Sequence, residues 1–209
     1  MIEAGPLIAF VGAAVLLLVV PGPVTVYILA RGMEQGRRGA MVAVLGIQAG
    51  EVLHIFVGAI GVGALIASSP FAFTVVTYAG AAYMLGIGVQ ALITRENHAH
   101  DVVPSNRSLW PTFVHSMMIN VLTPHTTLFY LAFLPAFVDP ARGSASMQFL
   151  TLGLVFMLLG LIIEGGFAVL AGSIRSGLSE SVRNMAAFRW ATGGIYILIG
   201  VVLVGNGVT

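Results

Sequence analysis

The chain has 209 residues, of which 58% are hydrophobic and only 8% are charged, and its mean hydropathy is +1.00. A soluble domain carries about 25% charged residues, so this composition excludes an ordinary soluble fold and predicts an all-α membrane protein. The net charge of +1 gives no support for nucleic acid as a partner, and the absence of cysteine excludes disulfides, thiolate metal sites and cysteine nucleophiles.

Apolar runs between charged residues predict six transmembrane helices of about 20 residues or more. They cover residues 6–30, 40–68, 71–94, 109–138, 147–173 and 188–208. Spans two and three are separated only by Ser68-Ser69-Pro70, which is a tight turn signal. The polar linker 95–108 is the longest loop, and it divides a single transmembrane domain (1–209) into halves of about 1–94 and 109–209.

The positions of arginine predict the orientation of these spans. Seven of the nine arginines lie between spans one and two, in the central linker, or between spans five and six, Arg189 lies at the adjoining start of span six, and Arg142 alone lies on the other side. Short cytoplasmic loops retain arginine, so the linker is expected to be cytoplasmic and both termini extracytoplasmic. Because each half contains three spans, the two halves are expected to be inverted repeats.

Proline interrupts the first span of each half, at Pro21-Gly22-Pro23 and at Thr123-Pro124-His125. A proline inside a helix costs about 3 kcal/mol or more. In hydrocarbon, the carbonyl groups that it frees need partners inside the protein or in a wet cavity. Matched breaks of this kind in the two halves of a membrane protein indicate a transporter binding site, so spans one and four are expected to be broken helices.

Both breaks carry the chemistry of a helix start, because glycine and threonine are accepted N-caps and proline is favoured at the first helical position. Two such N-termini, approaching from inverted halves, offer free N–H groups and about half a positive charge each, which favours a carboxylate. The candidate binding residues are Pro21, Gly22, Pro23, Asn120, Thr123, Pro124 and His125. The alternative is that each proline only kinks its helix and that the polar neighbours only satisfy the broken backbone.

Three ionisable side chains within the spans, Glu51, His54 and Glu164, are candidates for proton coupling. Glu51 and His54 share a helix face because they lie three residues apart, and ionisable groups in spans usually face a cavity or a partner. Glu51 is interpreted as a site for a substrate ammonium or a proton, and His54 as a proton carrier. The alternative is a mutual hydrogen bond that only fixes helix packing. For Glu164, a functional role and simple burial are equally open.

Small residues recur every four positions in span two, at Gly46, Gly50 and Gly58, in register with His54. This spacing predicts a groove that admits a closely packed helix, either within the chain or in a homodimer. The Glu51-x-x-His54 pair also resembles half of a helix-borne metal site, but such sites need several more ligands, so neither a metal nor another cofactor is expected. No G-x-S-x-G is present, and no enzyme activity is expected.

Two long stretches resemble the LysE/RhtB-type amino-acid exporters. The first, PGPVTVYILARGMEQGRRGAMVAVLGIQAGEVLHIF, is similar to the family signature and has Glu51 and His54 where the family has an acidic residue and a histidine. The second, NVLTPHTTLFYLAFLPAFVDP, is similar to a family pattern of N-x-x-N-P-K, then aromatics and P-x-F-V. It departs at Thr123 and His125, where the family usually has asparagine and lysine.

The resemblance implies a secondary exporter of amino acids or their derivatives in the bacterial inner membrane, driven by proton exchange. Its expected partners are the small-molecule substrate, protons and the lipid bilayer. Two other functions stay open: export of metal or other inorganic cations, and a passive channel or structural membrane protein.

Overall fold

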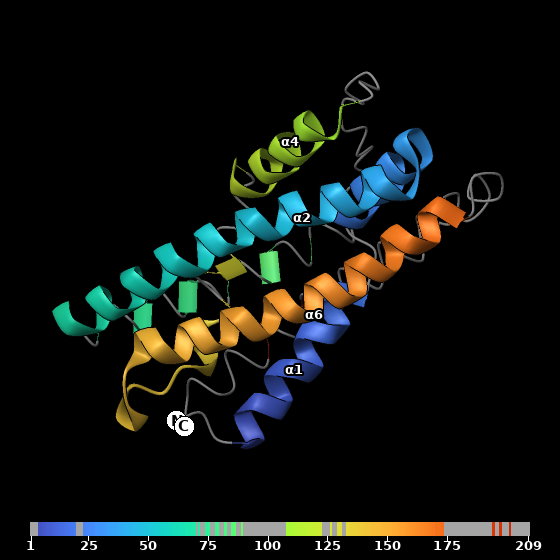
Figure 1. The fold of residues 1–209 in the computed structure, drawn as a ribbon. Coiled ribbons are helices and arrows are strands. Elements are labelled where there is room, and N and C mark those ends of the chain that lie inside the picture. The colour runs from blue at the N-terminus through green and yellow to red at the C-terminus, as the bar shows by residue number, and fades with distance from the viewer. Residues whose placement is uncertain are drawn as a thin grey trace.

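The computed structural model describes residues 4–19, 23–69, 108–122 and 133–173, with residues 71, 74–75, 78–79, 82, 85–86, 89, 126, 129–130, 194, 197 and 201. The elements are α1 (Ala4–Val19), α2 (Pro23–Ser68), α4 (Leu109–Leu122), the short 3-10 helices η1 (Pro135–Phe137) and η2 (Pro140–Arg142), and α6 (Ala145–Ser173) (Figure 1). No strand occurs among these residues, which agrees with the predicted helical membrane protein.

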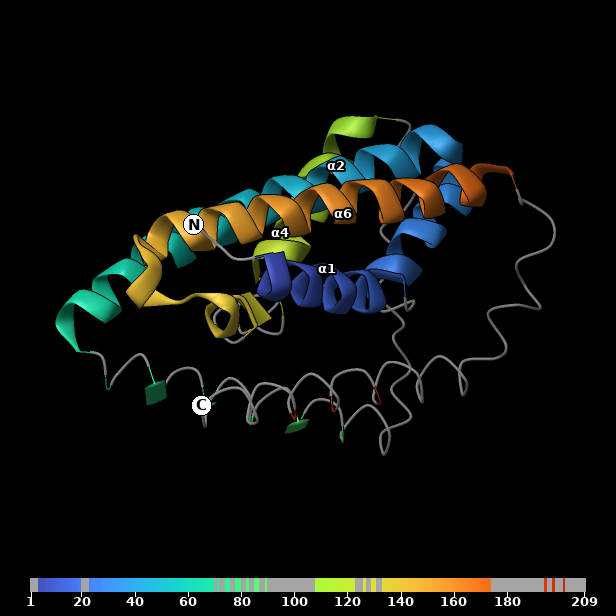
Figure 2. The same ribbon diagram turned by 90° about the horizontal axis from the view of Figure 1, so that it is seen from below.

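The first predicted span is interrupted where the sequence indicates. α1 ends at Val19 and α2 begins at Pro23, which takes the first helical position as expected. Pro21 and Gly22 lie outside the described residues. Figure 2 shows the chain continuing from α1 into the first part of α2 before it reverses direction. Span one therefore consists of two short helices rather than one long helix.

The reversal inside α2 takes place at Gly36, which has φ +72° and ψ −173°. This region of backbone conformation is essentially restricted to glycine. Helix continues on both sides of Gly36, so one residue replaces the longer loop expected between spans one and two. Arg31, expected in that loop, lies in the helix and is buried. After Gly36 the helix extends about 48 Å at 1.5 Å per residue, which exceeds the ~30 Å hydrocarbon core.

Glycines bring three helices into close contact. α2 and α6 lie side by side, and α4 packs on α2 (Figures 1 and 2). A Cβ atom on Gly46 would come within 2.8 Å of the Ser116 Cβ, and one on Gly50 within 2.8 Å of the Asn120 Cβ. A Cβ on Gly58 would collide with an aromatic ring of α6. The predicted groove is confirmed, and it is occupied by α4 and α6 of the same chain.

An aromatic cluster joins α1 to the segment that follows α4. The ring of Phe10 lies 5.5 Å from the ring of Phe133 and 5.2 Å from that of Phe137. The ring of Phe129 stacks on Phe133 at 4.9 Å and lies 5.0 Å from Phe156 of α6. These buried rings link the beginning of the chain to its second half.

Large apolar side chains stay exposed on the outer faces of α2 and α6. They include Leu53, Phe56, Val57, Ile60, Leu154, Leu158, Ile162 and Leu170. Apolar surface of this extent is typical of a membrane contact. Two helical stretches, Val24–Ala64 and Ala145–Ala171, are long and apolar enough to cross a membrane. Most of 71–94 and 188–208 lies outside the described residues, so six spans and the inverted repeat stay predictions.

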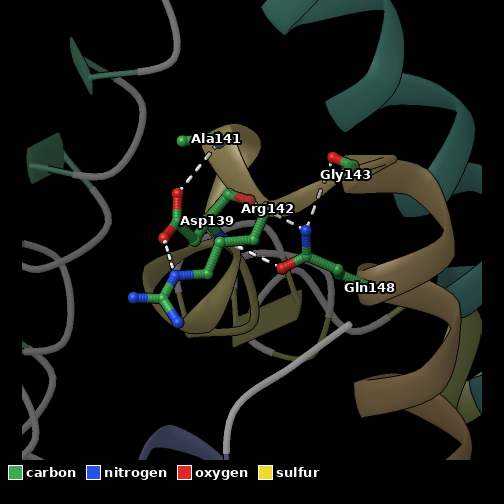
Figure 3. Close-up of polar contacts among 5 residues, drawn as sticks. All are labelled: Asp139, Ala141, Arg142, Gly143 and Gln148. Atoms are coloured by element: carbon green, nitrogen blue, oxygen red, sulfur yellow. Dashed lines mark hydrogen bonds and ion pairs between the residues drawn. The ribbon is translucent and has the colours of Figure 1, made fainter.

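The connection between η1 and α6 is held by one amide side chain (Figure 3). Gln148 accepts a hydrogen bond from the Asp139 backbone N at 3.0 Å and donates to the Asp139 carbonyl oxygen at 2.8 Å. Asp139 in turn accepts from the Ala141 backbone N at 2.9 Å and from the Arg142 Nε at 2.6 Å. Ser144 caps α6 by accepting from the Met147 backbone N at 3.4 Å. The stretch PAFVDP therefore forms a compact turn.

Replacement of Gly36 by alanine should lower the free energy of unfolding by about 1–3 kcal/mol, because a Cβ is strained in this backbone conformation. Thermal unfolding of the purified protein in detergent measures the change. Gly12→Ala is the matched control, since Gly12 has open space around it in a regular helix. Equal unfolding temperatures for the two variants would contradict the assigned reversal.

Replacement of Gln148 by methionine, which has a similar size, should destabilise the turn by about 1–3 kcal/mol, because the Asp139 backbone groups lose their partner. Faster hydrogen exchange at residues 135–143 would report the loss. Thr151→Val serves as the control, as its hydroxyl is exposed and bonds to the Met147 carbonyl of its own helix. Unchanged exchange in Gln148→Met would show that the turn does not depend on this side chain.

Candidate functional site

Six polar side chains gather between α2, α4 and α6, and we call them the polar cluster. α2 contributes three of them from successive turns, α4 one, the segment after α4 one, and α6 one. Five are buried to more than nine-tenths, Glu51 being 4% exposed, and His54 is half-buried. The members are Gln48, Glu51, His54, Asn120, Tyr130 and Glu164. A polar group is costly to bury without a partner, so such a concentration indicates a site.

A hydrogen bond across the cluster links α2 to α6. The Gln48 Nε2 donates to Glu164 Oε2 at 3.1 Å. This contact places the Glu164 carboxylate on the same side of α2 as Glu51, and the two carboxylates interact electrostatically. The structure therefore brings together two acids that are 113 positions apart in the sequence.

His54 connects α2 to the second proline break. Its Nε2 lies 3.2 Å from the backbone carbonyl oxygen of Asn120 and donates to it. In a regular helix this carbonyl would accept from the N–H four residues later, but that residue is Pro124, which has none. His54 thus supplies the donor that the proline lacks. The imidazole ring of His54 also stacks on the Tyr130 ring, with the two ring centroids 5.5 Å apart.

The alternative of a mutual Glu51–His54 hydrogen bond is wrong for the described geometry. His54 is occupied by the Asn120 carbonyl, and Glu51 Oε2 has no hydrogen-bond partner among the described residues. Glu51 instead faces the Tyr130 hydroxyl and the Glu164 carboxylate. A buried carboxylate oxygen with no partner is unusual in a native protein, which indicates that Glu51 meets a ligand, a proton or water.

Three further cluster atoms are buried and lack a hydrogen-bond partner within the described part of the chain. Together with Glu51 Oε2 they are Gln48 Oε1, Asn120 Oδ1 and the Tyr130 hydroxyl. Leaving one such group unpaired costs about 1–3 kcal/mol. All four atoms are oxygens: three of them only accept hydrogen bonds, and the Tyr130 hydroxyl can also donate one. The cluster therefore favours a species that donates hydrogen bonds.

A second polar network joins the first part of α2 to α4. The Tyr27 hydroxyl donates to the Ser116 Oγ at 3.1 Å, since Ser116 itself donates to the Thr112 carbonyl at 2.6 Å. Thr112 Oγ1 donates to Gln35 Oε1 at 2.9 Å. The Arg31 guanidinium lies 5.1 Å from the centre of the Tyr27 ring. These contacts hold the helix that restarts at residue 23 against the second half of the chain.

The structure brings together four of the residues singled out from the sequence: Glu51, His54, Glu164 and Asn120. Pro23 begins α2. Pro21, Gly22, Thr123, Pro124 and His125 lie outside the described residues, so the meeting of two helix N-termini stays a prediction. No group of three metal-binding side chains occurs within the described part of the chain.

Sequence reasoning missed Gln48 and Tyr130 as members of the cluster. Gln48 could have been found, because it lies three residues before Glu51 and so shares its helix face. Tyr130 gave no comparable signal, since it follows the second break and helical periodicity cannot be extended across a break.

Comparison with known proteins identifies relatives along nearly the whole chain. The family described as LysE type translocator matches residues 15–207. An uncharacterized membrane protein of Vibrio cholerae is 32% identical over 167 residues, covering 80% of this chain and 81% of that protein. A homoserine/homoserine lactone efflux protein of Salmonella typhimurium is 27% identical over 195 residues, covering 93% and 94%. A leucine efflux protein of Enterobacter sp. strain 638 is 31% identical over 169 residues, covering 76% and 78%.

No solved structure matches the chain.

The Gln48–Glu164 contact predicts a non-additive pair of mutations. Gln48→Leu should destabilise the protein by about 1–3 kcal/mol, because Glu164 loses its donor while it stays buried. The double variant Gln48→Leu/Glu164→Leu should be more stable than Gln48→Leu alone, because both polar groups are then removed. Thermal unfolding of Gln48→Leu, Glu164→Leu and the double variant in detergent gives the coupling free energy between the two side chains. Strictly additive effects would show that the contact contributes nothing.

Proposed function

We propose that the chain, which belongs to the LysE type translocator family, exports amino acids or close derivatives of them. It is a membrane translocator and not an enzyme. The observation that carries the proposal is the family match over residues 15–207, together with amino-acid efflux relatives that align with most of the chain. The polar cluster adds a buried site where a substrate can be recognised.

In the proposed mechanism Glu51 couples substrate to protons. Its carboxylate is buried, and its Oε2 has no partner among the described residues. An isolated buried carboxylate is costly, and either a proton or an ammonium group removes that cost. Since one carboxylate cannot hold both at full strength, the two ligands compete. This competition links outward movement of the substrate to inward movement of a proton.

The substrate carboxylate is assigned to the two breaks. The helix N-termini predicted from the sequence at Gly22-Pro23 and Thr123-Pro124 would each offer free N–H groups and a positive dipole end. Asn120 lies at the last turn of α4, directly before the second break, and its side chain packs on Gly50 of α2. An amino acid that spans the breaks and the polar cluster would thus present its carboxylate to the breaks and its ammonium group to the cluster.

Two histidines and Glu164 complete the proposal. Glu164 is the second acid that exchanges a proton, oriented by Gln48. His54 holds the carbonyl freed by the second break, and proton transfer through it or through His125 is secondary. In this proposal the transporter lies in the bacterial inner membrane with both termini outside the cytoplasm. The glycine groove gives no support for a homodimer, because α4 and α6 fill it.

Efflux from inside-loaded vesicles tests this function. The wild-type protein should export a labelled amino acid from a panel that includes homoserine and leucine, and an imposed proton gradient should accelerate the export. Glu51→Gln should reduce gradient-driven export at least tenfold, because a neutral amide takes up neither a proton nor a counter-charge.

Glu34→Gln is the control, since Glu34 pairs with Arg31 on its own helix, outside the cluster. Unchanged gradient-driven export by Glu51→Gln would refute the coupling role. Transport by the wild-type protein without any effect of the gradient would favour a passive channel, and movement of divalent cations alone would favour the cation exporter.

A further inference from the structure

The fully buried side chains of α4 are all polar. They are Thr112, Ser116 and Asn120, and because they are spaced by four residues they form one stripe on a single helix face. Polar side chains inside a membrane usually face a cavity, water or a partner helix. The stripe begins at Thr112, which bonds Gln35. It ends at Asn120, whose buried Oδ1 has no hydrogen-bond partner within the described part of the chain. A line of polar side chains thus joins the polar cluster to the end of the molecule that carries Gly36.

The first part of α2, which we call the half-helix (Pro23–Gln35), lies against this stripe. The Tyr27 hydroxyl bonds the Ser116 Oγ at 3.1 Å, and the Thr112 Oγ1 donates to the Gln35 Oε1 at 2.9 Å. Both contacts join side chains, and each is a single hydrogen bond that water could replace. The half-helix therefore closes the stripe at the Gly36 end through contacts that can be broken and remade.

Both ends of the half-helix are suited to act as hinges. α1 ends at Val19 and α2 begins at Pro23, so the helix is interrupted at one end. At the other end Gly36 has φ +72°, and helix continues beyond it. Hinges are a few positions at the ends of elements that absorb large changes of backbone angle. The half-helix can therefore turn as a rigid body while its own helical hydrogen bonds stay intact.

The surface beneath the half-helix consists of small side chains. A Cβ atom at Gly32 would come within 2.5 Å of the Ala171 Cβ and 3.5 Å of the Ala40 Cβ. Ala43 and Ala168 belong to the same buried cluster as the half-helix. Alanine and glycine interdigitate less than large side chains do. Separation at this surface therefore disturbs less packing than separation at the aromatic cluster that holds α1.

The half-helix also buries side chains that water can hydrate. Thr25, Tyr27 and Arg31 are each at most 5% exposed. Moving a polar or charged group from the protein interior into water is favourable, whereas exposing an apolar group is costly. Hydration of these three side chains would offset part of the cost of opening on this side.

We propose that the half-helix is the gate between the polar cluster and the cytoplasm, which rests on the export function and orientation proposed above. In the structure Tyr27 and Gln35 hold the gate closed against α4. When the half-helix turns about Gly36, the polar stripe of α4 faces water and becomes the route by which a polar substrate reaches Asn120. An exporter loads its substrate from this side, so each transport cycle requires the gate to open.

An engineered disulfide tests whether the gate must move, because the chain has no cysteine of its own. The pair Gly32→Cys/Ala40→Cys spans Gly36, and a Cβ–Cβ separation of 3.5 Å suits a disulfide. Ala171→Gly is added, since the new Cβ would otherwise meet the Ala171 Cβ. We expect oxidation to reduce amino-acid efflux from vesicles at least tenfold, and a reductant to restore it.

Gly63→Cys/Ser146→Cys is the matched control. A Cβ at Gly63 would lie 3.6 Å from the Ser146 Cβ, so this disulfide joins α2 to α6 at the other end of α2 and should leave efflux unchanged. Titration of free thiols shows that each bond has formed. Undiminished efflux by the oxidised Gly32→Cys/Ala40→Cys protein would overturn the gate. Failure of this pair to form a disulfide would contradict the closed contact itself.

Thiol labelling tests the gate without a substrate. Ala40 is fully buried beneath the half-helix, so Ala40→Cys should react slowly with an impermeant maleimide added to the cytoplasmic face. Removal of both hydrogen bonds, by Tyr27→Phe and Thr112→Val, should speed this reaction at least tenfold. Ala14→Cys, buried in the aromatic-rich cluster at α1, should keep its rate. An unchanged rate at Ala40→Cys, or an equal rise at Ala14→Cys, would contradict a gate held by these bonds.

The two tests separate failure of the gate from failure of the proposed function. If the wild-type protein exports amino acids and the oxidised disulfide variant does so equally well, the gate is wrong and the export function stands. If the wild-type protein exports no amino acid, the export function is wrong, while the labelling rates still show whether the half-helix opens.

Discussion

A polar group inside a membrane protein must find its partner within the protein, because the hydrocarbon offers no water. This constraint explains the contacts of His54 and Gln48. His54 donates to the Asn120 carbonyl, which faces a proline four residues on and so has no backbone donor. Gln48 donates to the buried Glu164 carboxylate. Where the constraint is left unmet, at Gln48 Oε1, Glu51 Oε2 and Asn120 Oδ1, the protein has acceptor atoms available for a ligand.

Glycines make these contacts possible because they let helix backbones approach closely. Gly46 and Gly50 bring α4 onto α2, which places the last turn of α4 within reach of His54. Gly153 of α6 receives the side chain of Ile55, and Gly160 lies against Gln48 and Glu51. At each of these positions the missing side chain lets a neighbouring helix or its side chains come close.

The two parts of the broken first span are held by different kinds of contact. α1 packs through the ring of Phe10 against aromatic residues that follow α4. The helix that restarts at Pro23 is instead fixed to α4 by hydrogen bonds through Tyr27 and Thr112. Aromatic rings pack favourably over a range of separations, whereas a hydrogen bond depends on both distance and angle. The second attachment is therefore the more directional of the two.

The sequence by itself determined the helical membrane class, the interruption before Pro23, the end of α2 at Ser68, and the start of α4 at Leu109. Hydrophobicity and proline act locally, so their effects can be read from neighbouring residues. Glu51, His54 and Glu164 stood out for the same reason, since charge is rare in a span. Only the tertiary structure decided that Tyr130 joins Glu51, that His54 bonds the Asn120 carbonyl, and that Gly160 packs against Gln48. Those pairings depend on the rotation and separation of helices distant in the chain, which local sequence does not encode.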